Sequence, residues 1–444
     1  MNNGMKRIVI IGGGFAGLNL VKHLDSRYYD ITLIDRNNYH SFPPLFYQVA
    51  SAGLEPASIC FPFRRELRKR HKSRVHFLME TVRTIDTVKR VVTTALGETP
   101  YDILVVAAGT TNNFFNMPDL EKKVYTIKST PEALRCRNGI LALLERAAAA
   151  KTSAERRKLL NFVVTGGGPT GVEIAGALGE MKRYVLPREY PTIAQDEMSI
   201  TLVEGSGRLL GAMSEDASAA ARKAVESLMV KVRLGVNVSD YDAKEKTVTL
   251  ADGTRLEASM VIWTAGIKAM PFRWITADAG EDANPPFIVR GGRLKTNALC
   301  EVEGLEDVYA LGDIALMEGD AAFPKGHPQL AQVAIQQGRL LAANLNARSG
   351  RRPRRIRHFS YKDKGSMATV GRNRAVVDLP KVHFHGFMAW MVWMFIHLIS
   401  ILGMRNRLTV LINWIWAYFN YSTSLRLLIH PSPNPDNNDL RYFN

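Results

Sequence analysis

The sequence is short of cysteine, and this scarcity excludes two classes of protein. Its 444 residues include only three cysteines, Cys60, Cys136 and Cys300, and no two of them have CxxC spacing. A small disulfide-stapled fold needs many more cysteines, and a structural zinc site needs them in close pairs. We therefore expect a reducing compartment, no metal site and three chemically inert thiols.

Long apolar runs are missing from the amino-terminal segment. The run at residues 8–11 is followed by three glycines, whereas a signal peptide needs roughly seven to fifteen apolar positions. We expect a buried strand of a cytoplasmic protein instead. With 46% hydrophobic and 23% charged residues, the composition excludes disorder, coiled coil and collagen. The length predicts two or three domains, because single cores stop growing near ~250–300 residues.

Acidic residues are outnumbered by basic ones. Lys and Arg total 58 against 42 Asp and Glu, a net charge of +16, which favours nucleic acid, anionic lipid or an anionic ligand as a partner. No nucleic-acid-binding module accompanies this charge, so we expect no nucleic-acid partner. The basic runs at 64–74 and 351–357 fit attraction to an anionic bilayer surface, although each run taken alone is more simply a solvated surface.

Two glycine-rich segments resemble each other in the first half of the chain. In each, a buried strand runs into a GxGxxG turn and then into a helical pattern, and the two copies lie 154 residues apart. A pyrophosphate must approach the backbone at such a helix N-terminus, and a side chain at the middle glycine would block it. The spacing predicts two dinucleotide-binding domains in series. The glycines are Gly12, Gly14 and Gly17 in the first copy and Gly166, Gly168 and Gly171 in the second.

Each fingerprint is followed by a strand that ends in an acid. Asp35 lies 18 residues after Gly17, a spacing that suits a hydrogen bond to a ribose 2′-hydroxyl. Glu204 lies 33 residues after Gly171, more than the usual ~20, so we infer an insertion around residues 182–197. A carboxylate at this place would repel a 2′-phosphate, which favours NADH over NADPH.

The carboxyl-terminal part contains two apolar, Trp-rich segments, residues 386–404 and 408–421. The first has about the length of a membrane span, but His397 and Ser400 interrupt it, and the second is too short to return. We expect both to form helices in the headgroup boundary, with Arg405 and Arg407 reaching phosphate. A buried core or dimer helix is the alternative.

The sequence resembles the type II NADH dehydrogenases, the non-pumping NADH:quinone oxidoreductases, from about residue 6 to 429. Besides the fingerprints, the resemblance rests on NYHSFPPLFYQVA at 38–50, GVE at 171–173, LGD at 311–313 and AQxAxQxG at 331–338. It implies an α/β fold with two Rossmann-like dinucleotide-binding domains, for FAD and NADH, plus a C-terminal amphipathic helical membrane-binding region. The predicted boundaries are 1–120 and 286–349 for the FAD domain, 121–285 for the NADH domain and 350–444 for the membrane-binding region.

The resemblance also implies roles for individual residues. Glu173 is expected near the nicotinamide and flavin, where it would influence hydride or proton transfer; the alternative is a first-turn acid favoured by the helix dipole. Gln332 and Gln336, one helical turn apart, are expected on the quinone side of the flavin. Lys381 is either a surface lysine or a cation beside the flavin or the quinone. The expected cofactor-binding residues are Gly12, Gly14, Phe15, Ala16, Gly17, Asp35, Ala108, Gly109, Gly166, Gly168, Gly171, Glu204, Ala265, Gly266, Asp313, Ala331, Gln332 and Lys381.

By this resemblance the chain is an enzyme that transfers two electrons from NADH through FAD to a membrane quinone, ubiquinone or menaquinone, without pumping protons. We expect it on the cytoplasmic face of the inner membrane, and a homodimer is a further expectation. The alternatives are another quinone or ferredoxin reductase of this fold, such as a sulfide:quinone reductase, or a membrane-docked redox sensor. A disulfide reductase is disfavoured because residues 37–54 contain no cysteine, and a sulfide:quinone reductase because no cysteine follows Cys300.

Overall fold

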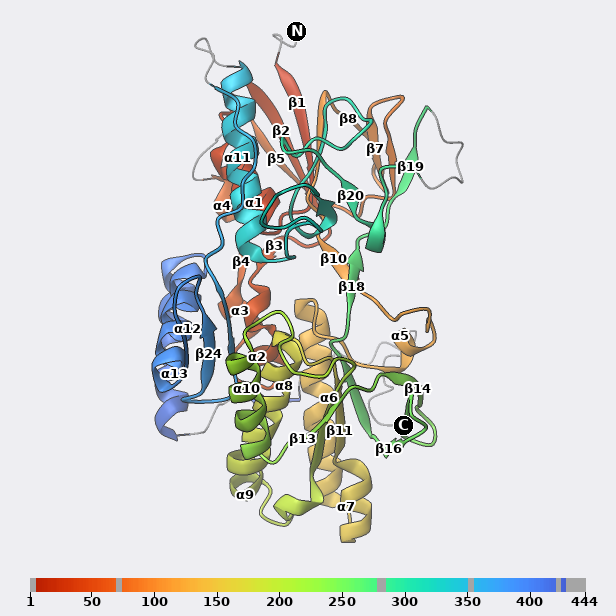
Figure 1. Cartoon of the computed structure of the whole chain (residues 1–444), viewed down its shortest axis with the longest axis vertical. Coiled ribbons are helices and arrows are strands. Elements are labelled where there is room, and N and C mark those ends of the chain that lie inside the picture. The colour runs from red at the N-terminus through yellow and green to blue at the C-terminus, as the bar shows by residue number, and fades with distance from the viewer. Residues whose placement is uncertain (1–4, 69–73, 278–284, 350–354, 421–424, 429–444) are drawn as a thin grey trace. The chain divides into compact units, whose positions relative to one another are not determined.

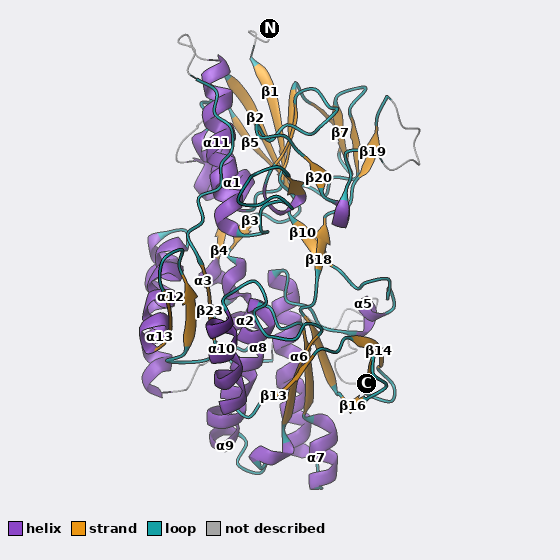
Figure 2. Ribbon diagram, in the orientation of Figure 1, coloured by secondary structure: helices purple, strands orange, loops and turns teal. Residues whose placement is uncertain are grey.

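The computed structural model describes residues 5–68, 74–277, 285–349, 355–420 and 425–428. The chain divides into two compact units: unit 1 contains residues 1–41, 61–111 and 267–363, and unit 2 contains residues 42–60, 112–266 and 364–444. Both units combine helices with sheets (Figure 1, Figure 2). The domain boundaries expected from the sequence stay predictions. Part of the two basic runs, residues 69–73 and 351–354, lies outside the described residues.

Unit 1 is built on a five-stranded parallel sheet in the order β21-β9-β1-β2-β5. Its strands read as nearly continuous apolar runs, which is typical of a parallel sheet covered on both faces. Helices α1 (Phe15–His23) and α11 (Ala331–Ser349) pack together beside this sheet. The strands are β1 (Lys6–Ile11), β2 (Tyr29–Asp35), β5 (Val75–Met79), β9 (Ile103–Val106) and β21 (Val308–Ala310).

A second sheet of unit 1, in the order β19-β6-β7-β8, shares one hydrophobic core with the parallel sheet. Trp274 and Phe287 meet edge to face in this core, with ring centroids 5.0 Å apart. The strands are β6 (Thr84–Asp86), β7 (Val91–Thr94), β8 (Gly97–Pro100) and β19 (Arg273–Ile275), and the short elements are α4 (Phe63–Arg68), η4 (Arg290–Gly292), β20 (Leu294–Lys295), η5 (Gly312–Ile314) and β22 (Ala315–Leu316). Four short strands lie where the chain passes between the units: β3 (Tyr39–Ser41), β4 (Cys60–Pro62), β10 (Thr110–Asn112) and β18 (Ile267–Ala269).

Unit 2 is built on a four-stranded parallel sheet in the order β13-β12-β11-β17, followed by an antiparallel β14-β15-β16 sheet. The strands are β11 (Asn161–Thr165), β12 (Ser199–Glu204), β13 (Lys231–Leu234), β14 (Val238–Asp242), β15 (Thr247–Leu250), β16 (Arg255–Glu257) and β17 (Met260–Trp263). The helices are η1 (Pro43–Leu45), α2 (Phe46–Ala50), α3 (Pro56–Ile59), α5 (Leu120–Lys123), α6 (Thr130–Ala149), α7 (Ser153–Leu159), α8 (Pro169–Glu180), η2 (Met181–Val185), α9 (Leu186–Glu189), η3 (Gln195–Glu197) and α10 (Glu215–Ser227).

The last part of unit 2 is an antiparallel sheet followed by two helices. Strands β23 (Ser366–Thr369), β24 (Ala375–Asp378) and β25 (His383–Gly386) lead into α12 (Phe387–Ser400) and α13 (Met404–Asn420). The 386–404 stretch is therefore not one long helix: its 14-residue helix stops at Ser400, and Gly403, with φ 82°, lies in the connection to α13. None of the described helices has both the length and the apolar character needed to cross a membrane.

The polar stretch at residues 131–158 forms two helices, α6 and α7. Between them Thr152 adopts extended backbone and caps α7, since its side chain accepts from the Glu155 N–H while the Glu155 side chain bonds back to the Thr152 N–H. This reciprocal capping box starts a new helix at that point.

Candidate functional site: two nucleotide cradles and a buried carboxyl

The turn after β1 forms a cradle in unit 1. Gly12 adopts a φ of 98°, and a Cβ there would lie 2.5 Å from the Ala107 carbonyl oxygen. A Cβ at Gly17 would lie 1.9 Å from the Gly12 oxygen, so α1 can begin this close to the strand only with glycine there. A Cβ at Gly14, by contrast, would meet nothing within 4 Å. Open space thus lies in front of the first N–H groups of α1, where an anion is favoured.

The turn after β11 repeats this cradle in unit 2. Gly166 also has a φ of 98°, and a Cβ at Gly171 would lie 1.8 Å from the Gly166 oxygen. Gly168, like Gly14, faces open space. Ala265 lies against Gly166 as Ala107 does against Gly12. A glycine with positive φ follows the neighbouring strand in each cradle, Gly109 in unit 1 and Gly266 in unit 2. The two fingerprints therefore fold into the same backbone shape.

An acid at the end of the second strand braces each cradle. In unit 1, Asp35 accepts from the N–H groups of Gly13 at 2.7 Å and Asn37 at 2.8 Å. Burial raises the pKa of Asp35, and these two N–H donors offset part of the rise. In unit 2, Glu204 accepts from the N–H groups of Gly167 and Ser206 in the same way. Both carboxylates thus stand at the carboxyl end of a parallel strand beside the glycine turn.

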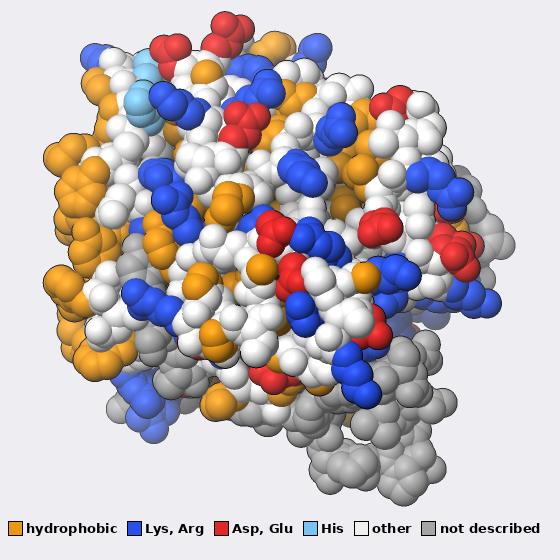
Figure 3. Space-filling model, turned by 90° about the horizontal axis from the view of Figure 1, so that it is seen from below, with side chains coloured by type: hydrophobic (Ala, Val, Ile, Leu, Met, Phe, Trp, Pro, Cys, Tyr) orange, Lys and Arg blue, Asp and Glu red, His pale blue; other side chains and the backbone are white. Residues whose placement is uncertain are grey.

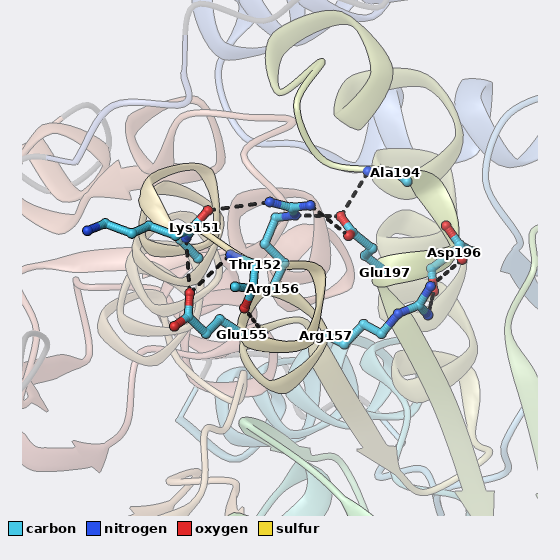
Figure 4. A network of polar contacts seen from close by, with 9 residues as sticks. Lys151, Thr152, Glu155, Arg156, Arg157, Ala194, Asp196 and Glu197 are labelled. Carbon is cyan, nitrogen blue, oxygen red and sulfur yellow. Dashed lines mark hydrogen bonds and ion pairs between the residues drawn. The ribbon is translucent and has the colours of Figure 1, made fainter.

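The longer spacing to Glu204 corresponds to extra elements between α8 and β12. These are the π-helix η2, α9 and η3. A network of ion pairs fastens η3 to α7 (Figure 4): Arg156 contacts both carboxylate oxygens of Glu197, at 2.8 and 3.0 Å, and Arg157 pairs with Asp196. Arg156 lowers the pKa of Glu197 to about 2, and only 3% of the Glu197 side chain is exposed. The network holds the inserted segment next to the strand that carries Glu204.

A third group of residues in unit 1 surrounds Asp313. Its Oδ2 accepts from the Thr110 hydroxyl at 3.3 Å, and its backbone carbonyl accepts from Gln329 Nε2 at 3.0 Å. The preceding Gly312 N–H donates to Oε1 of the buried Gln337 at 2.7 Å. Asp313 is therefore held by Gln329, just before α11, and by Thr110 of β10, while Gln337 of α11 holds the neighbouring Gly312.

Glu173 lies in the second turn of α8 and is buried, with 7% of its surface exposed. Burial raises the pKa of its carboxyl well above the usual range, although the carboxyl accepts a hydrogen bond from the Thr369 N–H. The helix-dipole alternative fails, because Glu173 is not in the first turn of α8. Burial instead favours the protonated form of this carboxyl.

Aromatic and amide side chains of unit 2 share this region with Glu173. Burial raises the pKa of the Tyr47 hydroxyl, and an ionised Glu173 carboxylate would raise it further. Gln48 Nε2 donates to this hydroxyl at 2.8 Å, and Trp414 Nε1 donates to Gln48 Oε1 at 2.8 Å. A chain of hydrogen bonds therefore runs from Tyr47 in α2 to α13.

The two glutamines of α11 that the sequence singled out, Gln332 and Gln336, differ in their surroundings. Gln336 is bound through both ends of its amide to the backbone of Lys362, donating to the carbonyl at 2.9 Å and accepting from the N–H at 3.1 Å. Gln332 is half-buried one turn earlier, next to Ala331. Lys381 is exposed between β24 and β25 in unit 2. The site roles of these residues stay predictions.

The described cysteines are unpaired. Cys136 and Cys300 are buried, and burial raises the pKa of both thiols, that of Cys300 to about 12. Cys60 is half-buried, and burial raises its pKa as well. Such thiols are mostly protonated at neutral pH and are poor nucleophiles. Among the described side chains, no group of three or more His, Cys, Asp or Glu is placed to hold a metal ion.

Family comparisons agree with this geometry. Residues 6–338 match the family of pyridine nucleotide-disulphide oxidoreductases, and residues 364–420 match the NDH2 C-terminal domain. The type II NADH:quinone oxidoreductase Ndh of Mycobacterium tuberculosis is 35% identical over 421 residues, which cover 93% of this chain and 88% of the relative. The chain belongs to the type II NADH:quinone oxidoreductase family. The resemblance seen in the sequence is thereby confirmed.

More distant relatives share the arrangement. An external alternative NADH-ubiquinone oxidoreductase of Yarrowia lipolytica mitochondria is 27% identical over 92% of this chain and 79% of its own length. The fold matches that of NDH2 from Plasmodium falciparum, solved with NADH, at a TM-score of 0.86 and 21% identity, covering 96% of this chain and 100% of that one. The sulfide:quinone oxidoreductase of Aquifex aeolicus has the related fold at a TM-score of 0.67 and 18% identity, with 96% of both chains covered.

For a type II oxidoreductase, the residues present fit two dinucleotides. Each cradle offers a helix N-terminus with open space in front of its middle glycine and a carboxylate beside it. Phe15 and Ala16 begin α1 in the first cradle, and Ala108 follows β9 beside it. The predicted α/β fold with two Rossmann-like domains is confirmed.

Several supporting residues of this type II oxidoreductase escaped the sequence analysis. His40 bonds through Nδ1 to the Gly13 carbonyl at 2.9 Å, and burial lowers its pKa to about 4, so its neutral ring braces the first cradle. Gln337 holds Gly312, and Gly338 allows α11 to approach α1, since a Cβ there would lie 2.5 Å from the Ala16 oxygen. Gln337 and Gly338 lie inside AQxAxQxG, next to the predicted site residue Gln336, and this position was the only signal for them in the sequence. His40 lies likewise inside the motif at 38–50.

Proposed function

We propose that this chain oxidises NADH and passes two electrons through FAD to a membrane quinone without pumping protons. The observation that carries the proposal is the repeated cradle, because one chain then has places for two dinucleotides. The 35% identity to a named type II NADH:quinone oxidoreductase over 93% of the chain supports the same reaction.

The chain's own residues bind and orient the two cofactors. We assign FAD to the Gly12 cradle with Asp35, Ala108, Gly109 and Asp313, and NADH to the Gly166 cradle with Glu204, Ala265 and Gly266. A flavin held there would supply the two-electron chemistry that connects NADH with the acceptor. Two backbone N–H groups hold the Glu204 carboxylate in place. NADPH would bring its 2′-phosphate next to this carboxylate, and the two negative charges would repel each other, so NADH is the favoured donor.

Reduction of a quinone to a quinol requires protons, and Glu173 is our candidate to supply one. Its carboxyl is buried, and burial raises its pKa and so favours the protonated form, which is the form required of a general acid. A chain of hydrogen bonds from Tyr47 through Gln48 to Trp414 lies in the same unit and connects α2 with α13. Gln332 and Gln336 remain our candidates for the quinone side of the flavin, with Lys381 as a candidate cation there.

We assign membrane docking to the outer face of α12 and α13. Large apolar side chains recur along both helices and are half or more exposed: Phe387, Met388 and Phe395 on α12, and Met404, Leu408, Ile412, Ile415, Trp416 and Phe419 on α13. Figure 3 shows a band of hydrophobic side chains along the left edge, with basic side chains around it. Exposed apolar patches with a polar rim mark interaction sites. A bilayer surface fits a lipid-soluble acceptor.

The side of the membrane, the quinone and the assembly follow from this proposal as expectations. We place the protein on the cytoplasmic face of the inner membrane, with ubiquinone or menaquinone as acceptor. A homodimer stays a prediction.

The test is an anaerobic absorbance experiment on the purified protein. We expect a yellow protein that NADH bleaches and that a soluble quinone analogue turns yellow again at a rate that matches steady-state turnover. Reduction by sulfide and not by NADH would favour a sulfide:quinone reductase. Bleaching by NADH with no reoxidation by quinone would favour the redox sensor.

A further inference from the structure

A groove of about 320 Å³ lies in unit 2 between α10 and the strands β24 and β25. Its lining is mostly apolar. The apolar part comes from small side chains one helical turn apart on α10, Ala220 and Ala224, and from Val370, Ala375 and Val376 on the opposite side. The groove lies apart from the Gly166 cradle, and no role in the proposed reaction uses it.

Basic side chains surround this apolar groove. Lys223 comes from α10, Arg374 from the turn before β24 and His385 from β25. Arg374 Nη1 is held by a hydrogen bond to Ser227 Oγ, which itself lines the groove. None of the lining residues is Asp or Glu, so the local potential favours an anion.

The groove ends where the exposed apolar face of α12 begins. Gly386 lines the groove and is also the N-cap residue of α12. The next two residues, Phe387 and Met388, are 50% and 66% exposed. The groove is thus continuous along the chain with the face that we assign to the bilayer.

We infer that this groove binds one anionic phospholipid, with an acyl chain along the small apolar residues and the phosphate among Lys223, Arg374 and His385. This inference rests on the proposed membrane docking. A lipid satisfies both observations, the apolar lining and the Lys223 and Arg374 cations, whereas a free phosphate would use only the cations. Because the site lies beside α12 and not on its outer face, it adds a preference for lipid charge to a docking surface that is otherwise apolar.

Vesicle co-sedimentation of the full chain tests the inference, with zwitterionic phosphatidylcholine vesicles compared with vesicles that also contain anionic phosphatidylglycerol. We expect wild-type protein to prefer the anionic vesicles. Lys223→Gln is expected to reduce partitioning to these vesicles about fivefold, the factor that corresponds to ~1 kcal/mol per cation. Ala224→Leu, which fills the groove without changing charge, is expected to reduce the preference as well. Neither variant should alter binding to phosphatidylcholine alone.

The matched control is Arg222→Gln. It removes the same charge from the same helix, but Arg222 is paired with Glu226 at 2.9 Å, so the lipid preference should remain. If Lys223→Gln and Arg222→Gln have equal effects, the preference is general surface electrostatics and the inference is wrong. Inorganic phosphate that abolishes the preference more than chloride of equal ionic strength would assign a small-anion site instead. A change of oligomeric state in Ala224→Leu would assign the groove to a second copy of the chain and overturn the lipid.

Turnover of NADH with a soluble quinone separates this inference from the proposed function. All three variants should keep wild-type turnover, because none of their residues lies in either cradle. A wild-type protein that turns over quinone but shows no preference for anionic vesicles overturns the lipid site alone. A wild-type protein without turnover overturns the proposed function.

Discussion

The two cradles have the same backbone but differ at one side chain beyond it. Asn19 in α1 and Glu173 in α8 are each the second residue after the last glycine of their fingerprint, 154 positions apart. Asn19 donates to the Phe15 carbonyl at 2.8 Å and accepts from Arg339 Nε of α11 at 3.3 Å. Glu173 is buried and accepts from the Thr369 N–H, and burial raises the pKa of its carboxyl. The shared backbone provides anion binding, and the residue behind it can give one copy an additional chemical role.

The largest expected effect comes from disturbing one cradle at a time. Gly17→Ala and Gly171→Ala each place a methyl group less than 2 Å from a carbonyl oxygen, and such overpacking costs about 1–3 kcal/mol locally. We expect Gly17→Ala to yield protein with little flavin, and Gly171→Ala to yield yellow protein that NADH bleaches only at much higher concentration. Flavin absorbance and NADH titration measure both outcomes. The opposite pattern would reverse the assignment of the cofactors.

Replacing the buried acid tests whether the difference between the cradles is chemical. Glu173→Gln removes the transferable proton but keeps the shape, and we expect reoxidation of the flavin by quinone to slow on the order of 10²-fold. Bleaching by NADH should change little. Because the folded-state pKa of Glu173 is raised, the ionised form is disfavoured on folding, so the variant should be at least as stable at neutral and higher pH.

Asn19→Ala is the matched control for Glu173. It changes the corresponding position of the first cradle and should leave both half-reactions within about twofold, since it removes only a bond within α1 and a long bond from Arg339, and no ionisable group. Stopped-flow absorbance separates the two half-reactions. Equal slowing of both by Glu173→Gln would show that the residue only supports the fold.

The inserted segment of the second cradle should be sensitive to acid. Glu197 has a pKa lowered to about 2 by Arg156, so its contribution to stability is present above the ordinary glutamate value of ~4.3 and is lost as the pH falls through about 2. Glu197→Gln is expected to lower the melting temperature by roughly 5 °C at neutral pH, since it leaves Arg156 without its partner. Melting curves at neutral and acidic pH check this, and the difference from wild type should shrink in acid.

The smallest expected effect concerns α11, which supports only the first cradle. Gln336→Ala removes both hydrogen bonds to the Lys362 backbone and should lower the free energy of unfolding by about 1 kcal/mol. Gln332→Ala leaves that clamp in place and serves as the comparison. We expect it to slow reoxidation by quinone while leaving bleaching by NADH nearly unchanged. Urea unfolding and stopped-flow absorbance measure the two variants.

The local signals in the sequence were enough to predict both cradles. Glycine spacing, apolar strands and a terminal acid act over a few dozen residues, and each fixes a backbone shape that few other residues permit. The inserted segment before Glu204 was also inferred from spacing alone. The ion-pair network of this segment could not be inferred, because the pairing of Arg156 with Glu197 depends on α7 and η3 lying side by side.

The surroundings of Glu173 were beyond the sequence for the same reason. Trp414 bonds to Gln48 across 366 positions, and Asn406 donates to the Cys60 carbonyl across 346. Nothing in a local pattern shows that residues 42–60 share a unit with the carboxyl-terminal helices. The helix-dipole explanation of Glu173 depended on a first-turn position, whereas α8 begins at Pro169 and places Glu173 in the buried second turn.

The most direct test of the account is the cofactor stoichiometry of the wild-type protein and of Gly171→Ala. The account predicts one FAD per chain in both proteins, with complete bleaching by one equivalent of NADH in the wild type and none at that concentration in the variant. A colourless wild-type protein, two flavins per chain, or equal bleaching of both proteins would contradict the claim that one repeated cradle holds two different dinucleotides.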